Sequence, residues 1–391
     1  LATGEINSFN QELRLAADYD IVSWIVGANY TRSVIDDDQL LSTAEVTSSK
    51  KLPNIPHFTL SGTVTDLTIK SASAFGNLEY AATDSLKLIA GARYTSVKQE
   101  FGGCSVIGDS IEAQLFNILQ RGPTPLQVGD CFTMDENFIP GLVRDNLDEN
   151  NTSFRLGANY KFDNDVLLYS SINRGFKAGG YSTLTGVQNQ QFLPVVQEKL
   201  IAYELGVKAP LFKRMVQLNA DVFYYDYTNK QFRGRSLDSI FGNLEKVVNI
   251  PESHVFGYEI EIQARPIRGL DITVAATKID TKVDEFEGYS QTAKFGDATE
   301  DFGGSEFPNT PDLQLVGDVQ YTFDIADGFE AFVGAGARHN SETNATFGTD
   351  PLFRIKAYTV YDVRAGVQPS DYSWSINLWG KNVTDEYYWN G

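Results

Sequence analysis

The sequence predicts an all-β protein: an antiparallel transmembrane β-barrel, of which about fourteen strands lie within the 391 residues. First, apolar and polar side chains alternate in segment after segment, which is the period of a two-faced strand. Second, short and long connections alternate strictly between these segments. Third, hydrophobic residues make up only 42% of the chain while aromatic residues reach 12%, as expected where half of each strand faces polar surroundings.

The clearest strands lie in the middle of the chain, where residues 154–162 alternate in polarity without an error. Four strands are predicted here, at 154–162, 166–176, 197–209 and 214–229, with short turns at 163–165 and 210–213. A longer, glycine-containing connection separates the two pairs. The pattern is that of two hairpins joined at the opposite end of the sheet.

The N-terminal part predicts strands at 11–16, 21–34, 67–82 and 86–100. Residues 35–66 are polar and contain Pro53 and Pro56, so they predict a loop. The connection 101–150 is the longest of all. It contains both cysteines of the chain, Cys104 and Cys131, and an oxidising compartment would allow them to form a disulfide.

The C-terminal part continues the same rhythm of strands and connections. The predicted strands are 254–265, 270–283, 313–323, 329–340, 358–367 and 373–383, and the long connections before and between them include 232–253 and 284–310. The turns at 266–269, 324–328 and 369–372 are short. A soluble sandwich has no reason to place all its long loops at one end, whereas a membrane barrel has short periplasmic turns and long extracellular loops.

Composition and charge exclude several classes of protein. The formal net charge of −19 argues against a nucleic-acid partner, because phosphate binding requires a basic surface. His57, His254 and His339 are scattered without ligand spacing, so no metal site is predicted. Glu259 and Glu261 share a strand face but have no nucleophile or histidine beside them, so no catalytic residue and no cofactor are predicted. These carboxylates fit a polar barrel lumen instead.

Several motifs, taken in order, resemble one known family. They are Gln11-Glu12-Leu13-Arg14-Leu15, Arg174-Gly175-Phe176-Lys177-Ala178-Gly179-Gly180-Tyr181, Tyr203-Glu204-Leu205-Gly206-Val207-Lys208, the strand from Leu218 to Tyr227, and Gly380-Lys381-Asn382-Val383-Thr384-Asp385-Glu386-Tyr387-Tyr388. Each motif alone is weak, but their order and spacing together resemble those of TonB-dependent outer-membrane receptors over essentially the whole chain.

The resemblance implies a 22-stranded barrel with an N-terminal plug, located in the outer membrane of a Gram-negative bacterium. Such receptors import a scarce nutrient, such as a ferric siderophore, with energy delivered through the TonB complex. Residues 1–391 are then expected to be a barrel fragment without the plug and the last strand. Two other classes stay open at this point: a passive outer-membrane porin, and a soluble β-rich protein that binds or hydrolyses carbohydrate.

Ligand recognition is expected in the long connections 101–150, 179–196, 232–253 and 284–310, because specificity in such folds lies in loops. Positive and aromatic side chains there suit an anionic chelate, and the candidate ligand-binding residues are Arg174, Lys177, Phe232, Arg233, Arg235, Phe241 and Lys246. The segment from Arg174 to Tyr181 has a second interpretation, as a flexible strand exit with only a structural role.

Overall fold

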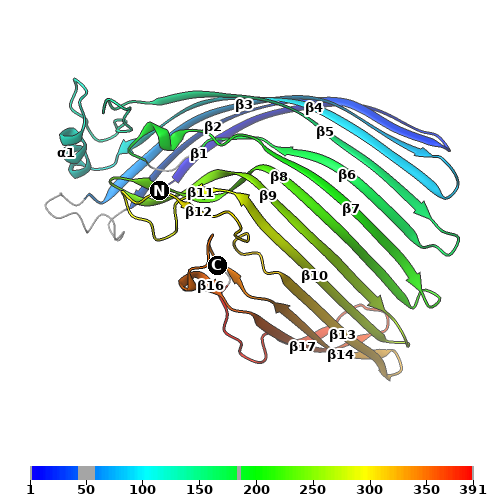
Figure 1. Cartoon of the computed structure of the whole chain (residues 1–391). Helices are drawn as coiled ribbons and strands as arrows, with labels where there is room; N and C mark the ends of the chain where they lie inside the picture. Colours follow the sequence, from blue (N-terminus) through cyan, green and yellow to red (C-terminus); the bar gives the residue numbers. More distant parts are fainter. Residues whose placement is uncertain (1, 43–57, 183–185, 390–391) are drawn as a thin grey trace.

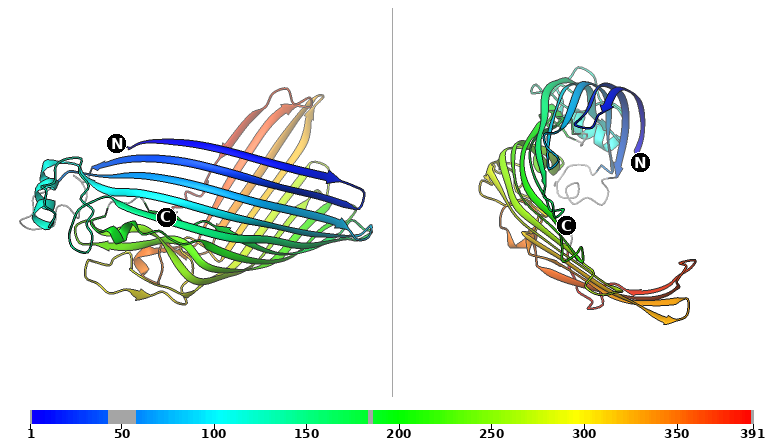
Figure 2. Two further views of the ribbon diagram at one scale, coloured as in Figure 1. Left: turned by 90° about the horizontal axis from the view of Figure 1, so that it is seen from above. Right: turned by 90° about the vertical axis from the view of Figure 1, so that its right-hand side faces the viewer.

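A computed structural model describes residues 2–42, 58–182 and 186–389. Fourteen strands form one continuous antiparallel sheet in the order β1-β2-β3-β4-β5-β6-β7-β8-β9-β10-β13-β14-β17-β18. Figure 1 shows neighbouring strands following one another in sequence, and Figure 2 shows the sheet curving into an open arc when it is viewed along its length. The predicted all-β fold and the number of strands are confirmed.

The first half of the sheet consists of β1 (Ala2–Asp18), β2 (Val22–Ser42), β3 (Leu60–Ala81), β4 (Leu86–Ile107), β5 (Val143–Lys161), β6 (Leu167–Lys177) and β7 (Glu198–Leu211). The second half consists of β8 (Val216–Asp238), β9 (Gly242–Ala264), β10 (Leu270–Glu285), β13 (Leu313–Ala326), β14 (Phe329–Asn340), β17 (Tyr358–Pro369) and β18 (Ile376–Gly380). Two further small sheets, β11 (Glu287–Gly288) with β12 (Glu300–Asp301) and β15 (Thr343–Asn344) with β16 (Arg354–Ile355), lie in long connections.

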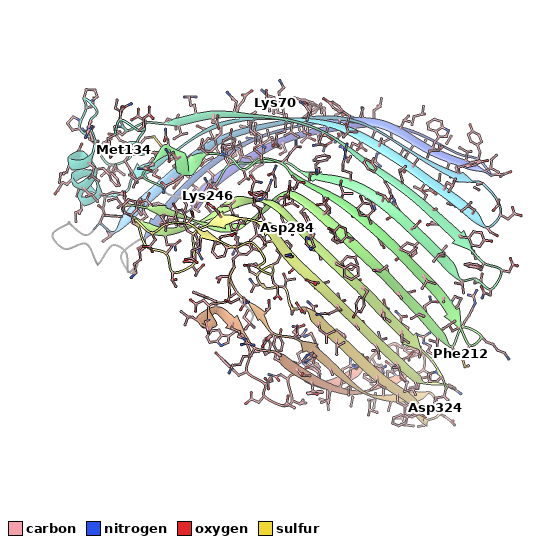
Figure 3. All side chains as sticks on the ribbon, in the orientation of Figure 1. Lys70, Met134, Phe212, Lys246, Asp284 and Asp324 are labelled. Atoms are coloured by element: carbon pink, nitrogen blue, oxygen red, sulfur yellow. A yellow bond between two sulfur atoms is a disulfide. The ribbon has the colours of Figure 1, made fainter. Side chains whose placement is uncertain are left out.

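Short turns and long connections lie at opposite ends of the sheet. Figure 3 labels Phe212 and Asp324 at the end with the short turns, and Met134 and Lys246 at the end with the long connections. The turn after β9 requires Gly269, whose φ is +81° and whose position leaves no space for a side chain beside the Thr322 carbonyl. We call the end with the long connections the rim.

Two predicted connections are shorter than expected because the strands continue beyond the alternating segments. β2 extends to Ser42 and β3 begins at Leu60, so much of 35–66 is strand. The predicted loop 232–253 is the upper part of a β8–β9 hairpin, paired from Val216↔Ala264 to Asp238↔Gly242. These parts lack strict polarity alternation because they project past the region with one apolar face, but backbone pairing still holds them extended.

The two faces of the sheet differ in chemistry, as the alternation predicts. One face has a row of apolar residues in register across β5 to β9, namely Leu156, Ile172, Tyr203, Tyr224 and Phe256. The other face has Glu204, Asp221 and Glu259 on neighbouring strands. Lys70 shares the apolar face with Leu78 and lies on the convex side of the sheet in Figure 3. The apolar face is therefore the outer face, and the polar face lines the interior.

An ion pair on the inner face ties together strands that are not adjacent. Arg364 on β17 donates from both terminal nitrogens to the Asp318 carboxylate on β13, each at 2.7 Å, and from Nε to Gln320 at 2.9 Å. The side chain crosses β14 over Gly334, where an added Cβ would lie 2.8 Å from the guanidinium carbon. A bidentate pair of this kind fixes geometry as well as charge.

Among the described residues, no helix is long and apolar enough to cross a membrane. The helices are α1 (Ser110–Leu119) and two short 3₁₀ turns, η1 (Asn189–Phe192) and η2 (Pro351–Phe353), all of which lie in connections at the rim. None was predicted from the sequence. Each is stabilised by packing or capping in a connection whose composition shows no strong helical period.

The arrangement of turns gives the first prediction. A cysteine placed at Thr299, an exposed rim position, is expected to react with a membrane-impermeant maleimide in intact cells, whereas one at Asn164, an exposed short-turn position, reacts only after the outer membrane is permeabilised. No free thiol competes in the described residues, because both described cysteines form a disulfide. Labelling of Asn164→Cys but not Thr299→Cys in intact cells would reverse the orientation.

Candidate functional site

The connection between β4 and β5 folds into a small hydrophobic core at the rim. The first rim core consists of Ile107, Ala113, Phe116, Leu126, Phe132, Met134 and Val187, with Ile240 and Phe241 from the β8–β9 hairpin packed against it. The Phe116 and Phe132 rings are fully buried and stacked with centroids 4.0 Å apart. A buried phenylalanine contributes roughly 2 to 3 kcal/mol relative to an exposed one, so this connection has a defined structure.

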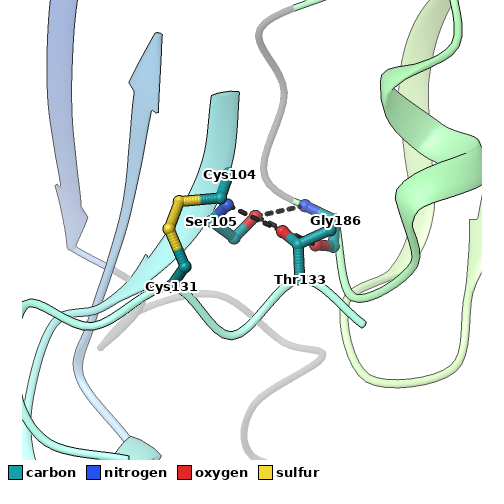
Figure 4. Close-up of a disulfide and its surroundings, with 5 residues drawn as sticks. All are labelled: Cys104, Ser105, Cys131, Thr133 and Gly186. Carbon is teal, nitrogen blue, oxygen red and sulfur yellow. Dashed lines mark hydrogen bonds between the residues drawn. A yellow bond between two sulfur atoms is a disulfide. The ribbon is translucent and has the colours of Figure 1, made fainter. Parts of the chain in front are cut away.

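A disulfide fastens this connection to β4. Cys104 and Cys131 are bonded, with their Cα atoms 5.7 Å apart (Figure 4). Cys104 lies within β4 and only Cys131 lies in the connection, which corrects the expectation that both belong to one loop. For this 27-residue separation the chain-entropy model gives roughly 3 to 4 kcal/mol of stabilisation.

Next to the disulfide, hydrogen bonds bring in the following long connection. Ser105 N donates to Thr133 Oγ1 at 2.8 Å, and Gly186 N donates to Ser105 Oγ at 2.8 Å (Figure 4). A larger residue at position 186 would displace the Gln191 side chain, because an added Cβ would lie 2.2 Å from Gln191 Oε1. The disulfide therefore stabilises the contact between two rim connections.

Two acidic residues begin α1. One oxygen of Asp109 accepts from the backbone of Ile111 and Glu112, and the other accepts from Thr59 and Leu60 at the start of β3. Burial acts to raise the pKa of Asp109, but these backbone hydrogen bonds outweigh it and hold the pKa below its usual range. Glu112 is fully buried, accepts from Gly108 N at 2.6 Å, and has its pKa raised by burial to about 7.

A second rim core lies beside the first and is built mainly from phenylalanine. It consists of Ile250, Val283, Phe286, Phe302 and Phe307, with Phe232, Val248, Val255 and Phe347 packed against it. These residues come from the β8–β9 hairpin, from the end of β10 and its following connection, and from the connection after β14. Segments more than 100 residues apart in sequence thus converge at one place.

A cavity of about 560 Å³ opens between the second rim core and the β8–β9 hairpin. Phe232, Phe286, Phe302 and Phe347 form an aromatic wall. The lining also includes three cations, Lys177, Arg233 and Arg235, and one carboxylate, Glu245. Its volume lies within the range of about 300 to 1,000 Å³ that is usual for small-molecule sites.

The cations of the cavity are only partly neutralised. Arg233 Nε lies 3.4 Å from Glu245, and an Arg235 terminal nitrogen lies 4.0 Å from the same carboxylate. Arg235 also donates to Gln291 Oε1 at 2.8 Å, which holds its guanidinium in place. Lys177 has no carboxylate within ion-pair distance among the described residues. Three cations against one carboxylate make a positive site in a chain whose net charge is −19.

Four of the seven residues predicted to bind ligand line this cavity: Lys177, Phe232, Arg233 and Arg235. None of the four lies in an irregular loop; Lys177 ends β6 and the other three are on β8. The other three predicted residues lie elsewhere. Phe241 packs on the first rim core, and Lys246 Nζ lies 3.5 Å from the Gln190 carbonyl oxygen.

Arg174 lies on the outer face of the sheet. Its side chain donates to the Thr152 carbonyl and stacks on Phe154 and Phe176. It pairs across the strands with Phe154 and Ile201, and the same face continues to Ile172 two residues before it. The strand period therefore separates Arg174 from Lys177, although the two are close in sequence.

Sequence reasoning missed the aromatic wall. Phe286 and Phe302 lie in the predicted ligand-binding connection 284–310, but no single residue there was singled out. Phe347 lies in the loop 341–355, which was not among the connections predicted to bind ligand. The available signal was the presence of phenylalanine in segments otherwise rich in Asp, Glu and Gly. Within the same described residues, no group of three or more His, Cys, Asp or Glu is placed to hold a metal ion.

The two-faced sheet with long connections at one end defines a transmembrane β-barrel protein of the outer membrane. Residues 3–383 match the family model of the TonB-dependent receptor-like β-barrel, and the chain belongs to that family. The family places it in the outer membrane of a Gram-negative bacterium.

Several proteins similar to this chain are described as receptors. The chain is 22% identical over 329 residues to a rhizobactin receptor from Rhizobium meliloti. The matched region covers 78% of this chain and 40% of that protein. Similar solved structures are the ferric yersiniabactin uptake receptor from Yersinia pestis, with a TM-score of 0.68 and 18% identity, and a siderophore receptor from Acinetobacter baumannii, with 0.66 and 16%.

These two structures match 99% and 100% of this chain, and this chain matches 50% and 53% of theirs. The chain therefore spans about half the length of the proteins it matches, and at these identities the structural likeness shows the fold alone.

The buried carboxyl in α1 gives the second prediction. The pKa of Glu112 is raised to about 7 from an ordinary 4.5, so the folded connection binds an extra proton between these values. Its contribution to local stability is complete below about pH 4.5 and is lost as the pH rises through about 7, with a slope of at most about 1.4 kcal/mol per pH unit. Hydrogen exchange of α1, corrected for intrinsic rates, measures this loss.

The matched variants are Glu112→Gln, which has nearly the same size without the charge, and Glu136→Gln, an exposed residue of the same connection. Glu112→Gln is expected to remove the pH dependence, and Glu136→Gln to leave it in place. The same pH dependence in Glu112→Gln as in the parent would contradict the assignment.

Proposed function

We propose that this chain is the barrel portion of a receptor that takes up a scarce nutrient of the ferric siderophore class, and that the cavity at the rim contacts this ligand. The observation that supports the proposal is the combination of Lys177, Arg233 and Arg235 with an aromatic wall in one cavity. Many metal chelates carry negative charge on an otherwise organic body. The cations of the cavity attract that charge, and the phenylalanine rings contact the apolar part.

The geometry suits recognition rather than free diffusion. A passive pore needs only a polar passage, whereas this rim has two packed cores, a disulfide and an ordered guanidinium. Side chains held in place before binding lose less conformational entropy when the ligand arrives. The names of the relatives, a rhizobactin receptor and a ferric yersiniabactin uptake receptor, support the same ligand class.

Transport energy is proposed to come from the TonB complex, which the family membership supports. The polar inner face is the surface on which a plug domain would rest. Arg364 and Asp318 satisfy one another there, so their charges remain paired whichever domain occupies the lumen.

The third prediction tests the cavity in the full-length receptor. The double variant Arg233→Gln/Arg235→Gln is expected to weaken binding of an anionic ferric siderophore by at least about tenfold, because a hydrogen bond to a charged group contributes about 1.5 to 3 kcal/mol. Glu245→Gln removes the carboxylate that partly neutralises both arginines, so it is expected to strengthen binding. Ferric catecholate and ferric hydroxamate complexes serve as probes, with binding followed by fluorescence quenching.

Arg265→Gln is the control, because Arg265 pairs with Asp271 at the short-turn end of the sheet. It is expected to leave affinity unchanged. If a siderophore binds the parent, and the double variant and Glu245→Gln bind it with the same affinity as the parent, then the cavity is not the ligand site. If iron-starved cells that lack the gene take up every tested siderophore as well as the parent cells do, the proposed function is refuted.

A further inference from the structure

Of the two arginines in the cavity, Arg235 is held much more firmly than Arg233. The Arg235 side chain is 21% exposed, whereas the Arg233 side chain is 80% exposed. Arg235 Nε donates to Gln291 Oε1 at 2.8 Å, and this bond joins β8 to the connection that follows β10. Arg235 is therefore the guanidinium with a defined direction, and Gln291 sets that direction.

The hydrogen bond to Gln291 leaves most of the Arg235 donors free for a ligand. It uses the N–H group on Nε, whereas the N–H groups on the terminal nitrogens are additional donors. Glu245, which is directly opposite on β9, lies 4.0 Å from a terminal nitrogen, and this is too far for a hydrogen bond. A planar guanidinium binds a pair of anionic oxygens through both terminal nitrogens, provided that its plane points at them.

Gln291 belongs to a short turn that is held by Asn243, a residue of β9. The turn covers residues 290–293, and Ala293 N donates to the Ser290 carbonyl at 3.2 Å. Asn243 Nδ2 lies 3.0, 3.1 and 3.1 Å from three carbonyl oxygens of the turn, those of Ser290, Gln291 and Ala293. Carbonyl oxygens that converge in this way need a donor between them. The Asn243 amide supplies that donor and so fixes the turn that carries Gln291.

The period of the β8–β9 hairpin places Asn243 beside the cavity. Arg235 pairs with Glu245, and Asn243 lies two residues before Glu245 on the same face of β9. Asn243 and Arg235 therefore both face the connection after β10. The contacts form a closed circuit, which runs from Arg235 through the hairpin to Asn243, across to the turn, and back through Gln291 to Arg235.

The amide oxygen of Asn243 shows that the donor is the important part of this side chain. Asn243 Oδ1 is buried and accepts no hydrogen bond from the residues that the structure describes. A buried acceptor without a partner destabilises a fold. Leucine has a similar size and would avoid this loss, but it could not donate to the turn. The amide donor is thus what distinguishes asparagine from an apolar residue at position 243.

We propose that Asn243 is a positioning residue for the cavity, because it fixes the turn whose Gln291 directs the terminal nitrogens of Arg235 at an anionic ligand. This role rests on the proposed function, since it concerns the ligand of the same cavity. Asn243 is not among the residues that line the cavity, so it acts through Arg235 and does not touch the ligand.

The first test needs no ligand and uses the full-length receptor in detergent. Phenylglyoxal modifies guanidinium groups, and mass spectrometry of the digested protein gives the rate at each arginine. Asn243→Leu is expected to raise the rate at Arg235 at least about threefold, because the net free energy of one hydrogen bond corresponds to a factor of about two to ten. Gln291→Ala, which removes the same bond to Arg235 directly, is expected to do likewise. The rate at Arg233, which is already exposed, is expected to stay the same.

The second test measures binding of a ferric tris-catecholate complex, which is anionic, by fluorescence quenching. Asn243→Leu is expected to weaken binding at least about threefold in the parent and to have no further effect in the Arg235→Gln variant, because coupled residues are not additive. A residue that only stabilised the rim would weaken binding by the same factor in both.

Asn249→Leu is the matched control. Asn249 is also on β9, and its Nδ2 donates to the Val196 and Asn229 carbonyls at 3.0 and 2.8 Å, so it holds a different rim connection. This variant is expected to leave the modification rate of Arg235 unchanged and to show no coupling to Arg235→Gln. The heat-dependent shift in electrophoretic mobility reports whether each variant is folded, and Asn243→Ala replaces Asn243→Leu if the latter fails to fold.

Two results would overturn the positioning role. The first is an unchanged modification rate of Arg235 in Asn243→Leu. The second is equal weakening of binding by Asn243→Leu with and without Arg235→Gln. Failure of the cavity as the ligand site looks different: the parent and Arg235→Gln then bind the complex equally well. That result removes the part of Asn243 in ligand binding, even where Arg235 modification is faster in Asn243→Leu.

Discussion

Backbone hydrogen bonding between neighbouring strands is the constraint on which the rest of this structure depends. In a membrane each unpaired N–H or C=O costs several kcal/mol, so a spanning sheet must keep its ladder continuous. The chain does so in strict sequence order, with each strand of the large sheet pairing to the strand before and after it from β2 to β17. Once this register is set, it decides which side chains face the membrane and which face the lumen, because a slip of one residue would exchange the two faces.

The same pairing continues past the membrane and builds the rim. β8 and β9 stay in register up to Asp238↔Gly242, so Arg233 and Arg235 are held on a hairpin rather than on a loose loop. The rim connections then bury their phenylalanines in two separate cores. The Cys104–Cys131 disulfide stabilises the first core, and residues of the second core line the cavity. Recognition surfaces are more selective when their side chains are ordered in advance, and here strands, aromatic packing and a covalent bond each contribute to that order.

Charge is distributed over three separate surfaces, each with its own physical role. In the lumen, Arg364 and Asp318 neutralise one another. In the cavity, three cations face one carboxylate, which leaves an attraction for anions. On the outer face, Arg32, Lys70 and Lys98 lie side by side, and Glu100 and Asp148 pair with the two lysines. The large negative net charge of the chain conceals these local arrangements, since the field at a site depends on neighbouring groups and not on the total.

The sequence by itself determined the fold class, the number of strands and the two ends of the barrel, because period-two alternation and connection length are local properties of the chain. It also determined the family, and it singled out Lys177, Phe232, Arg233 and Arg235. Only the tertiary structure decided that these four meet Phe286, Phe302 and Phe347, which come from distant connections. It likewise placed Arg174 on the outer face and Phe241 in a core, and it extended β8 and β9 through a predicted loop. Contacts between residues far apart in sequence depend on the packing of the rim, which no local pattern records.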